Sequence, residues 1–183
     1  MSRVTILIFV SFFPACLLIL RQAISSEHLS YSLLAIGLFL LAIDQARMAD
    51  LDLRQVMIAK VNGKDRRLNR FFRLTLLTII TELAGFYLTQ RSLGWGIQLV
   101  LFSQLMFNGL ATIQLQISGA EVTIITRSIG DRLRLIMANG IAMSLMGLWM
   151  AKIAPLAIVS SLWAIAIAYA SLKIWRLLSS TAA

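Results

Sequence analysis

Six long apolar runs alternate with short polar segments along the chain, and this pattern predicts helices that cross a membrane. Each run holds about 17 to 22 residues, close to the length of about 20 that an α-helix needs to cross a hydrocarbon core. We therefore predict an all-α fold, a polytopic transmembrane helical bundle that forms a single membrane domain over residues 1–183. The predicted spans cover residues 4–20, 29–46, 71–90, 94–115, 135–151 and 154–172.

Two short connections predict how neighbouring spans are joined. Residues 91–93 form a tight link, which predicts that the third and fourth spans make a helical hairpin. Pro155 suits the first turn of the last span.

The first run also has features of a signal peptide, because Ala23 and Ser25 form a small-x-small pattern. Its apolar core is longer than the about 7 to 15 residues of such peptides, which favours a retained span.

The longest polar segment, residues 47–70, predicts a basic loop that begins with a short helix at the membrane surface. Asp50 is placed to cap this helix, and Asn62-Gly63 is a signal for its end. The apolar stripe of this helix consists of Leu53, Val56, Met57 and Val61. Residues 121–128 also contain several β-branched residues, and for them the sequence leaves a short strand and a second surface helix open as alternatives.

Composition excludes an ordinary soluble domain. Hydrophobic residues make up 59% of the chain, charged residues only 14%, and the mean hydropathy is +0.84. The net charge of +9 does not indicate a nucleic-acid partner, because the basic residues flank apolar runs instead of gathering on a solvated face. We expect membrane lipids to be the main partners of the chain.

The distribution of basic residues predicts the orientation of the bundle. With six spans, 14 of the 17 lysines and arginines fall on one side of the membrane and 3 on the other. Basic residues in short loops are retained on the cytoplasmic side. Both termini are therefore predicted to be cytoplasmic.

A dense basic cluster precedes the third span and predicts contact with anionic lipid head groups, each basic residue contributing about 1 kcal/mol. A docking surface for a protein partner is the alternative. The cluster consists of Lys64, Arg66, Arg67, Arg70 and Arg73.

Glu82 lies near the middle of the third span, where an ionised side chain costs about 2.5 to 3.5 kcal/mol. It shares one helix face with several small and hydroxylated residues, and polar residues of the fourth span fall within an arc of about 120° that can meet this face. The predicted intramembrane polar cluster consists of Glu82, Thr78, Gln98, Gln104 and Asn108. Three roles stay open: hydrogen bonding between helices, a proton or cation site, and contact with a lipid, pigment or quinone.

The last two spans carry stripes of small residues, which predict close helix packing. We expect these spans to pack on each other, with a face toward a partner subunit as the alternative. The stripes contain Gly140, Ser144 and Gly147 in the fifth span and Ser161, Ala164 and Ala168 in the sixth.

The sequence lacks the motifs of common enzymes. His28 is the only histidine, and neither a GxSxG elbow nor a P-loop occurs. We predict a non-catalytic protein with no metal site and no cofactor.

One stretch resembles a group of known proteins. Residues 68–115 read LNRFFRLTLLTIITELAGFYLTQRSLGWGIQLVLFSQLMFNGLATIQL. This stretch is similar to small integral membrane proteins of cyanobacteria. The resemblance implies a plasma or thylakoid-type membrane, and it assigns no activity and no functional residue.

Two functional hypotheses follow from these patterns. The first is an accessory, assembly or scaffolding component of a larger membrane complex, with a membrane-protein partner. The alternative is a small proton- or ion-coupled transporter that uses Glu82.

Overall fold

A computed structural model describes residues 3–62, 65–118 and 121–181 of the chain. Within these residues the fold is 85% helical and has six α-helices. A two-stranded sheet and a short 3₁₀ helix connect the fourth and fifth of them. The elements in order are α1 (Arg3–Ser25), α2 (Leu29–Asn62), α3 (Arg66–Leu88), α4 (Leu93–Leu110), β1 (Ile113–Ser118), β2 (Glu121–Thr126), η1 (Gly130–Arg132), α5 (Leu133–Met150) and α6 (Pro155–Thr181).

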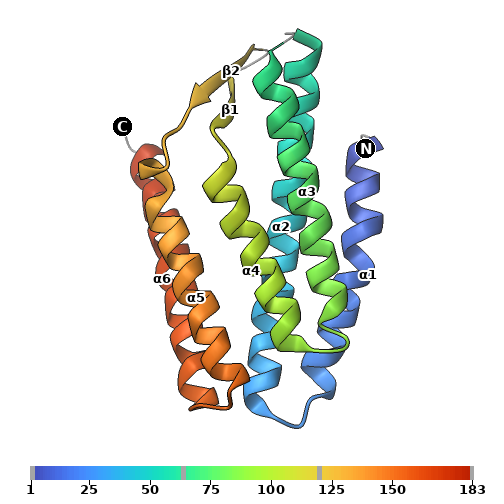
Figure 1. Cartoon of the computed structure of the whole chain (residues 1–183), viewed down its shortest axis with the longest axis vertical. Helices are drawn as coiled ribbons and strands as arrows, with labels where there is room; N and C mark the ends of the chain where they lie inside the picture. The colour runs from blue at the N-terminus through green and yellow to red at the C-terminus, as the bar shows by residue number, and fades with distance from the viewer. Residues whose placement is uncertain (1–2, 63–64, 119–120, 182–183) are drawn as a thin grey trace.

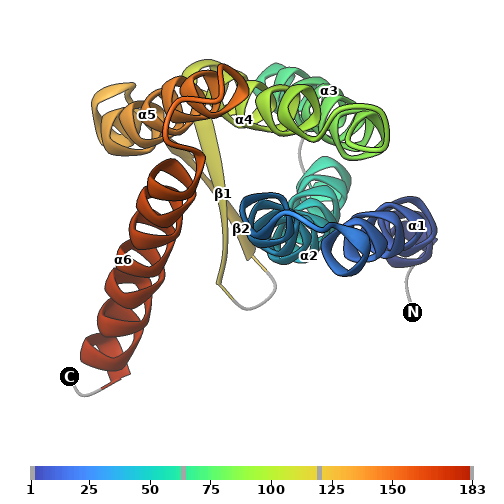
Figure 2. The same ribbon diagram turned by 90° about the horizontal axis from the view of Figure 1, so that it is seen from below.

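The helices run up and down along one long axis. Figure 1 shows both ends of the described chain at the same end of the bundle, together with the β-hairpin and the connection from α2 to α3. Seen from below, α3, α4 and α5 form one layer, and α1 and α2 lie against it (Figure 2). Helix α6 begins beside α5 and then diverges from the bundle toward its C-terminal end.

Helix length and composition support the prediction of a multi-pass membrane protein. Five helical segments are long and apolar enough to cross a membrane: α1, most of α2, α3, α4 and the segment from Gly130 to Met150. Among the described residues, the apolar part of α6 runs from Pro155 to Ala168 and is shorter. The membrane and bundle predictions are confirmed at this level, whereas six spans and their orientation stay predictions.

Helix α2 corrects the predicted break after residue 46. It continues without interruption to Asn62, so the expected surface helix forms the last turns of α2. The predicted loop 47–70 is therefore helical at both ends, in α2 up to Asn62 and in α3 from Arg66. The reason is local, because no glycine or proline occurs between Leu38 and Asn62. At 1.5 Å per residue, its 34 residues extend about 51 Å, more than a hydrocarbon core requires.

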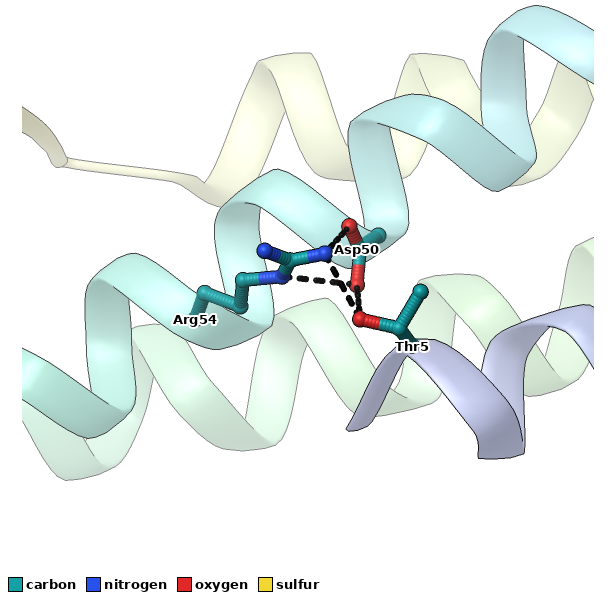
Figure 3. A network of polar contacts seen from close by, with 3 residues as sticks. All are labelled: Thr5, Asp50 and Arg54. Atoms are coloured by element: carbon teal, nitrogen blue, oxygen red, sulfur yellow. Dashed lines mark hydrogen bonds and ion pairs between the residues drawn. The ribbon is translucent and has the colours of Figure 1, made fainter. Parts of the chain in front are cut away.

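Asp50 is an interior residue of α2 and not a helix cap. Its carboxylate forms an ion pair with Arg54 one turn later and accepts a hydrogen bond of 3.0 Å from the Thr5 hydroxyl of α1. Arg54 also donates to the Thr5 hydroxyl (Figure 3). The three side chains therefore connect the start of α1 to the last third of α2.

The all-α prediction holds for 85% of the described fold, and a short β-hairpin is an addition to it. Helix α4 ends at Leu110 instead of continuing to residue 115, and β1 pairs antiparallel with β2, with Ile113 opposite Thr126. For residues 121–128 the strand was therefore the right alternative. Ile113 and Leu115 are buried against the ends of α2 and α3, so the hairpin packs on the bundle.

Close contact between α3 and α4 depends on two glycines. A Cβ atom added at Gly96 would lie 2.7 Å from the Gly85 carbonyl oxygen and 2.7 Å from the Thr89 amide nitrogen. A Cβ atom added at Gly85 would lie 2.7 Å from Val100 Cγ2. The backbones of the predicted helical hairpin approach closely because these positions have no side chain.

The small-residue stripes of α5 and α6 do not form the close interface that the sequence predicted. A Cβ atom at Gly140 would meet no atom within 4 Å, and Gly147 is exposed. Ser144 donates its hydroxyl proton to the Gly140 carbonyl of its own helix. Ser161, Ala164 and Ala168 are also exposed, since α6 diverges from α5.

Candidate functional site

A cavity of about 660 Å³ lies among α2, α3, α4, α5 and α6. Most of its wall is apolar, with Leu38, Ile97 and Met146 among the residues that form it. The wall also contains three carboxylates, Asp44 and Asp52 from α2 and Glu82 from α3. Among the described residues, no lysine, arginine or histidine lines this cavity. Its lining is therefore acidic in a chain whose net charge is +9.

Glu82 is the most deeply buried of these three acidic residues. Only 2% of its surface is exposed, and its carboxyl group interacts with Ser103 of α4. Its Oε1 atom has no hydrogen-bond partner among the described residues. A buried carboxylate oxygen without a partner is costly to keep ionised, so a cationic group in the cavity would offset this cost.

Asp44 and Asp52 widen the acidic region along α2. They stand eight residues apart, which is about 12 Å along the helix axis. Arg132 is the basic residue that interacts electrostatically with Asp52. Arg132 is itself buried, and its Nη2 atom donates to the Ile113 carbonyl at 3.3 Å, so it also holds the start of the hairpin. Asp52 thus lies where the cavity approaches the hairpin end of the bundle.

The structure brings four of the five predicted cluster residues to this one cavity. Thr78, Glu82, Gln104 and Asn108 all line it. Gln98 lies elsewhere, because its Nε2 atom donates to the Met143 carbonyl of α5 at 2.9 Å. Gln98 therefore joins α4 to α5.

The hydrogen bonds of the other cluster residues stay mostly within their own helices. Thr78 donates to the Leu74 carbonyl, and Asn108 donates to the Gln104 carbonyl. The Nε2 atom of Gln104 is buried without a partner among the described residues. The Gln104 Nε2 donor and the Glu82 Oε1 acceptor therefore both lack partners among the described residues, and both residues line this cavity. This pattern suits a polar ligand better than hydrogen bonding between helices.

The predicted basic cluster lies at the start of α3. Arg66, Arg67, Arg70 and Arg73 are exposed, whereas Lys64 lies outside the described residues. Asp65 caps α3, and its carboxylate accepts a hydrogen bond of 2.8 Å from the Arg67 amide. The Arg67 side chain also bonds to it and holds the pKa of Asp65 below its usual value. The exposed side chains of Arg66, Arg70 and Arg73 add positive charge at this end of α3.

Sequence reasoning missed Asp44, Asp52 and Asn139 as lining residues. The second span was predicted to end at residue 46, between Asp44 and Asp52, so the sequence did not indicate that Asp52 follows Asp44 two turns later on the same helix. Once α2 is continuous, positions 44, 48 and 52 recur every four residues and share one face. This spacing was the available signal.

No family model, no curated protein and no solved structure matches this chain. The chemistry of the cavity is therefore argued from its own residues. Carboxylates inside an apolar wall that contains no described basic residue can attract a cation, and a volume of about 660 Å³ leaves room for a ligand of many atoms.

Proposed function

We propose that the chain is a small membrane carrier that binds a cationic solute in the cavity between α2 and α6. One observation carries this proposal. Glu82 is buried in the cavity wall with its Oε1 atom unpartnered, and every other charged residue described in that wall is also acidic. Ionisable residues within membrane spans usually face an interior pathway and act on ions or protons.

The proposed topology has six spans with both termini on the cytoplasmic side. Its support is the even number of helices, which brings both described ends to one end of the bundle (Figure 1). The exposed arginines at the start of α3 lie at this same end, where positive residues are retained and anionic head groups attract them. In this proposed topology the acidic cavity lies within the membrane.

An accessory role in a larger membrane complex is the second candidate. It is favoured by the exposed small residues of α5 and α6, because such residues permit another helix to approach closely. The divergence of α6 leaves this face uncovered by other described helices (Figure 2). A partner helix on this face is compatible with a ligand in the cavity, but a purely structural role would require no cation.

Cation flux in proteoliposomes tests the carrier proposal. The purified chain is reconstituted, and imposed gradients of sodium, potassium and an alkylammonium salt are followed with a dye that reports membrane potential. We expect at least one gradient to dissipate about tenfold faster than in protein-free vesicles. Vesicles that dissipate no gradient faster than the protein-free control would contradict the carrier. Copurification of a membrane protein in fixed stoichiometry would then support the accessory role.

A further inference from the structure

We propose that the ligand is an amphipathic organic cation with a single positive charge and an apolar body. This inference rests on the proposed function and defines the substrate class of the same cavity. It follows from the size of the cavity, the spacing of its carboxylates and the apolar wall that surrounds them.

Cavity size favours an organic ligand over a bare ion. A volume of about 660 Å³ is within the range of about 300 to 1,000 Å³ that is typical of sites for drug-sized molecules. Such sites have mostly apolar walls and a few placed polar groups, as this cavity has. An inorganic cation in it would leave most of the wall without a partner.

The spacing of the acidic residues is unsuited to enclosing an inorganic ion. Asp44 and Asp52 are separated by about 12 Å along α2. Within the described parts of the chain, no group of three or more acidic, histidine or cysteine side chains lies close enough to hold a metal ion. An extended molecule can approach separate carboxylates, whereas a dehydrated ion needs several oxygen ligands around one point.

The cavity wall also offers an aromatic surface at a fixed position. The Trp163 side chain of α6 donates its Nε1 proton to the Leu33 carbonyl of α2 at 3.2 Å, which fixes the ring in the cavity wall. Gly37 lies beneath this ring, because a Cβ atom there would contact Trp163 at 3.6 Å. Indole rings attract organic cations through their faces and also pack against apolar groups.

Glu82 supports a single charge on the ligand. It is the one carboxylate of the described wall that is almost fully buried, and its free Oε1 atom can accept a hydrogen bond or an ionic contact. One buried negative charge is balanced by one positive charge, and a second cationic group would have to be buried without an equally close partner. The less buried Asp44 and Asp52 then attract the cation on its way to Glu82.

Equilibrium binding of two probes of nearly equal size tests this inference. The purified full chain in lipid nanodiscs is titrated with tetraphenylphosphonium, a monovalent apolar cation, and with tetraphenylborate, its anionic counterpart. We expect the phosphonium to bind the wild type about thirtyfold more tightly than Glu82→Gln. The borate should distinguish the two proteins by less than about twofold. Glu27→Gln, the same change at an exposed position between α1 and α2, should bind the phosphonium like the wild type.

The outcomes separate failure of this inference from failure of the proposed function. If wild type, Glu82→Gln and Asp44→Asn all bind the phosphonium equally, the inference that the ligand is an organic cation is wrong. If sodium or potassium instead raises the thermal stability of the wild type but not of Glu82→Gln, cation binding survives and only the substrate class is wrong. If no cation distinguishes the two folded proteins, both proposals fail.

Discussion

Replacement of Glu82 by glutamine is expected to reduce cation flux in proteoliposomes by about thirtyfold, close to the protein-free background. The substitution keeps the size of the side chain and removes its charge. It should not unfold the protein, because Glu82 has no ion-pair partner among the described residues and a neutral amide is less costly to bury. Flux is measured at equal protein content, and thermal unfolding is recorded for both proteins.

Glu27→Gln is the matched control, because it makes the same chemical change outside the cavity and should leave flux unchanged. A Glu82→Gln protein that is folded and transports at the wild-type rate would refute the role of this carboxylate. Loss of flux in both variants would indicate that flux depends on the net charge of the protein and not on a carboxylate in the cavity.

Replacement of Gly96 by alanine is expected to destabilise the protein by about 3 kcal/mol, at the upper end of the cost of overpacking. The added methyl group would lie against the Gly85 carbonyl and the Thr89 amide, which are backbone atoms and cannot rotate away. Helices α3 and α4 must then separate, which moves Glu82 relative to Gln104. Thermal unfolding in mild detergent measures the loss.

Gly109→Ala is the control for this prediction, because Gly109 is on the same helix and a Cβ atom there would meet nothing within 4 Å. Its stability should stay the same or rise slightly, since alanine favours helix. Equal unfolding temperatures for the two alanine variants would contradict the close approach of α3 and α4.

The positions of the helices were largely predictable from sequence, because apolar runs bounded by charges mark membrane spans. The face of α3 that carries Thr78 and Glu82 also followed from helical spacing, and these residues do line one cavity with Gln104. The other half of the acidic lining was missed for a specific reason. Charged residues such as Asp44 and Arg47 indicate the end of the apolar part of a span, but they do not show whether the helix itself continues beyond the hydrocarbon core, as α2 does.

Two further differences come from tertiary structure. The strand β1 begins where an apolar helix was expected to continue, and its alternation of Ile113 and Leu115 with Gln114 is too short to decide between helix and strand. Small residues on α5 and α6 predicted mutual packing, but such stripes do not specify which helix they approach. In the structure α6 diverges from α5, and its small residues are exposed.

Charge-selective labelling of the cavity wall measures whether the cavity attracts cations. In a chain whose one cysteine is replaced (Cys16→Ala), Asn108→Cys places a thiol in the cavity wall, and Ser25→Cys places one at the exposed end of α1. Each is treated with a cationic and an anionic methanethiosulfonate reagent. We expect the ratio of cationic to anionic labelling rates to be about tenfold higher at position 108 than at position 25, and tetraphenylphosphonium to slow labelling at position 108. Equal ratios at both positions, or a preference for the anionic reagent at position 108, would contradict an acidic cavity that attracts cations.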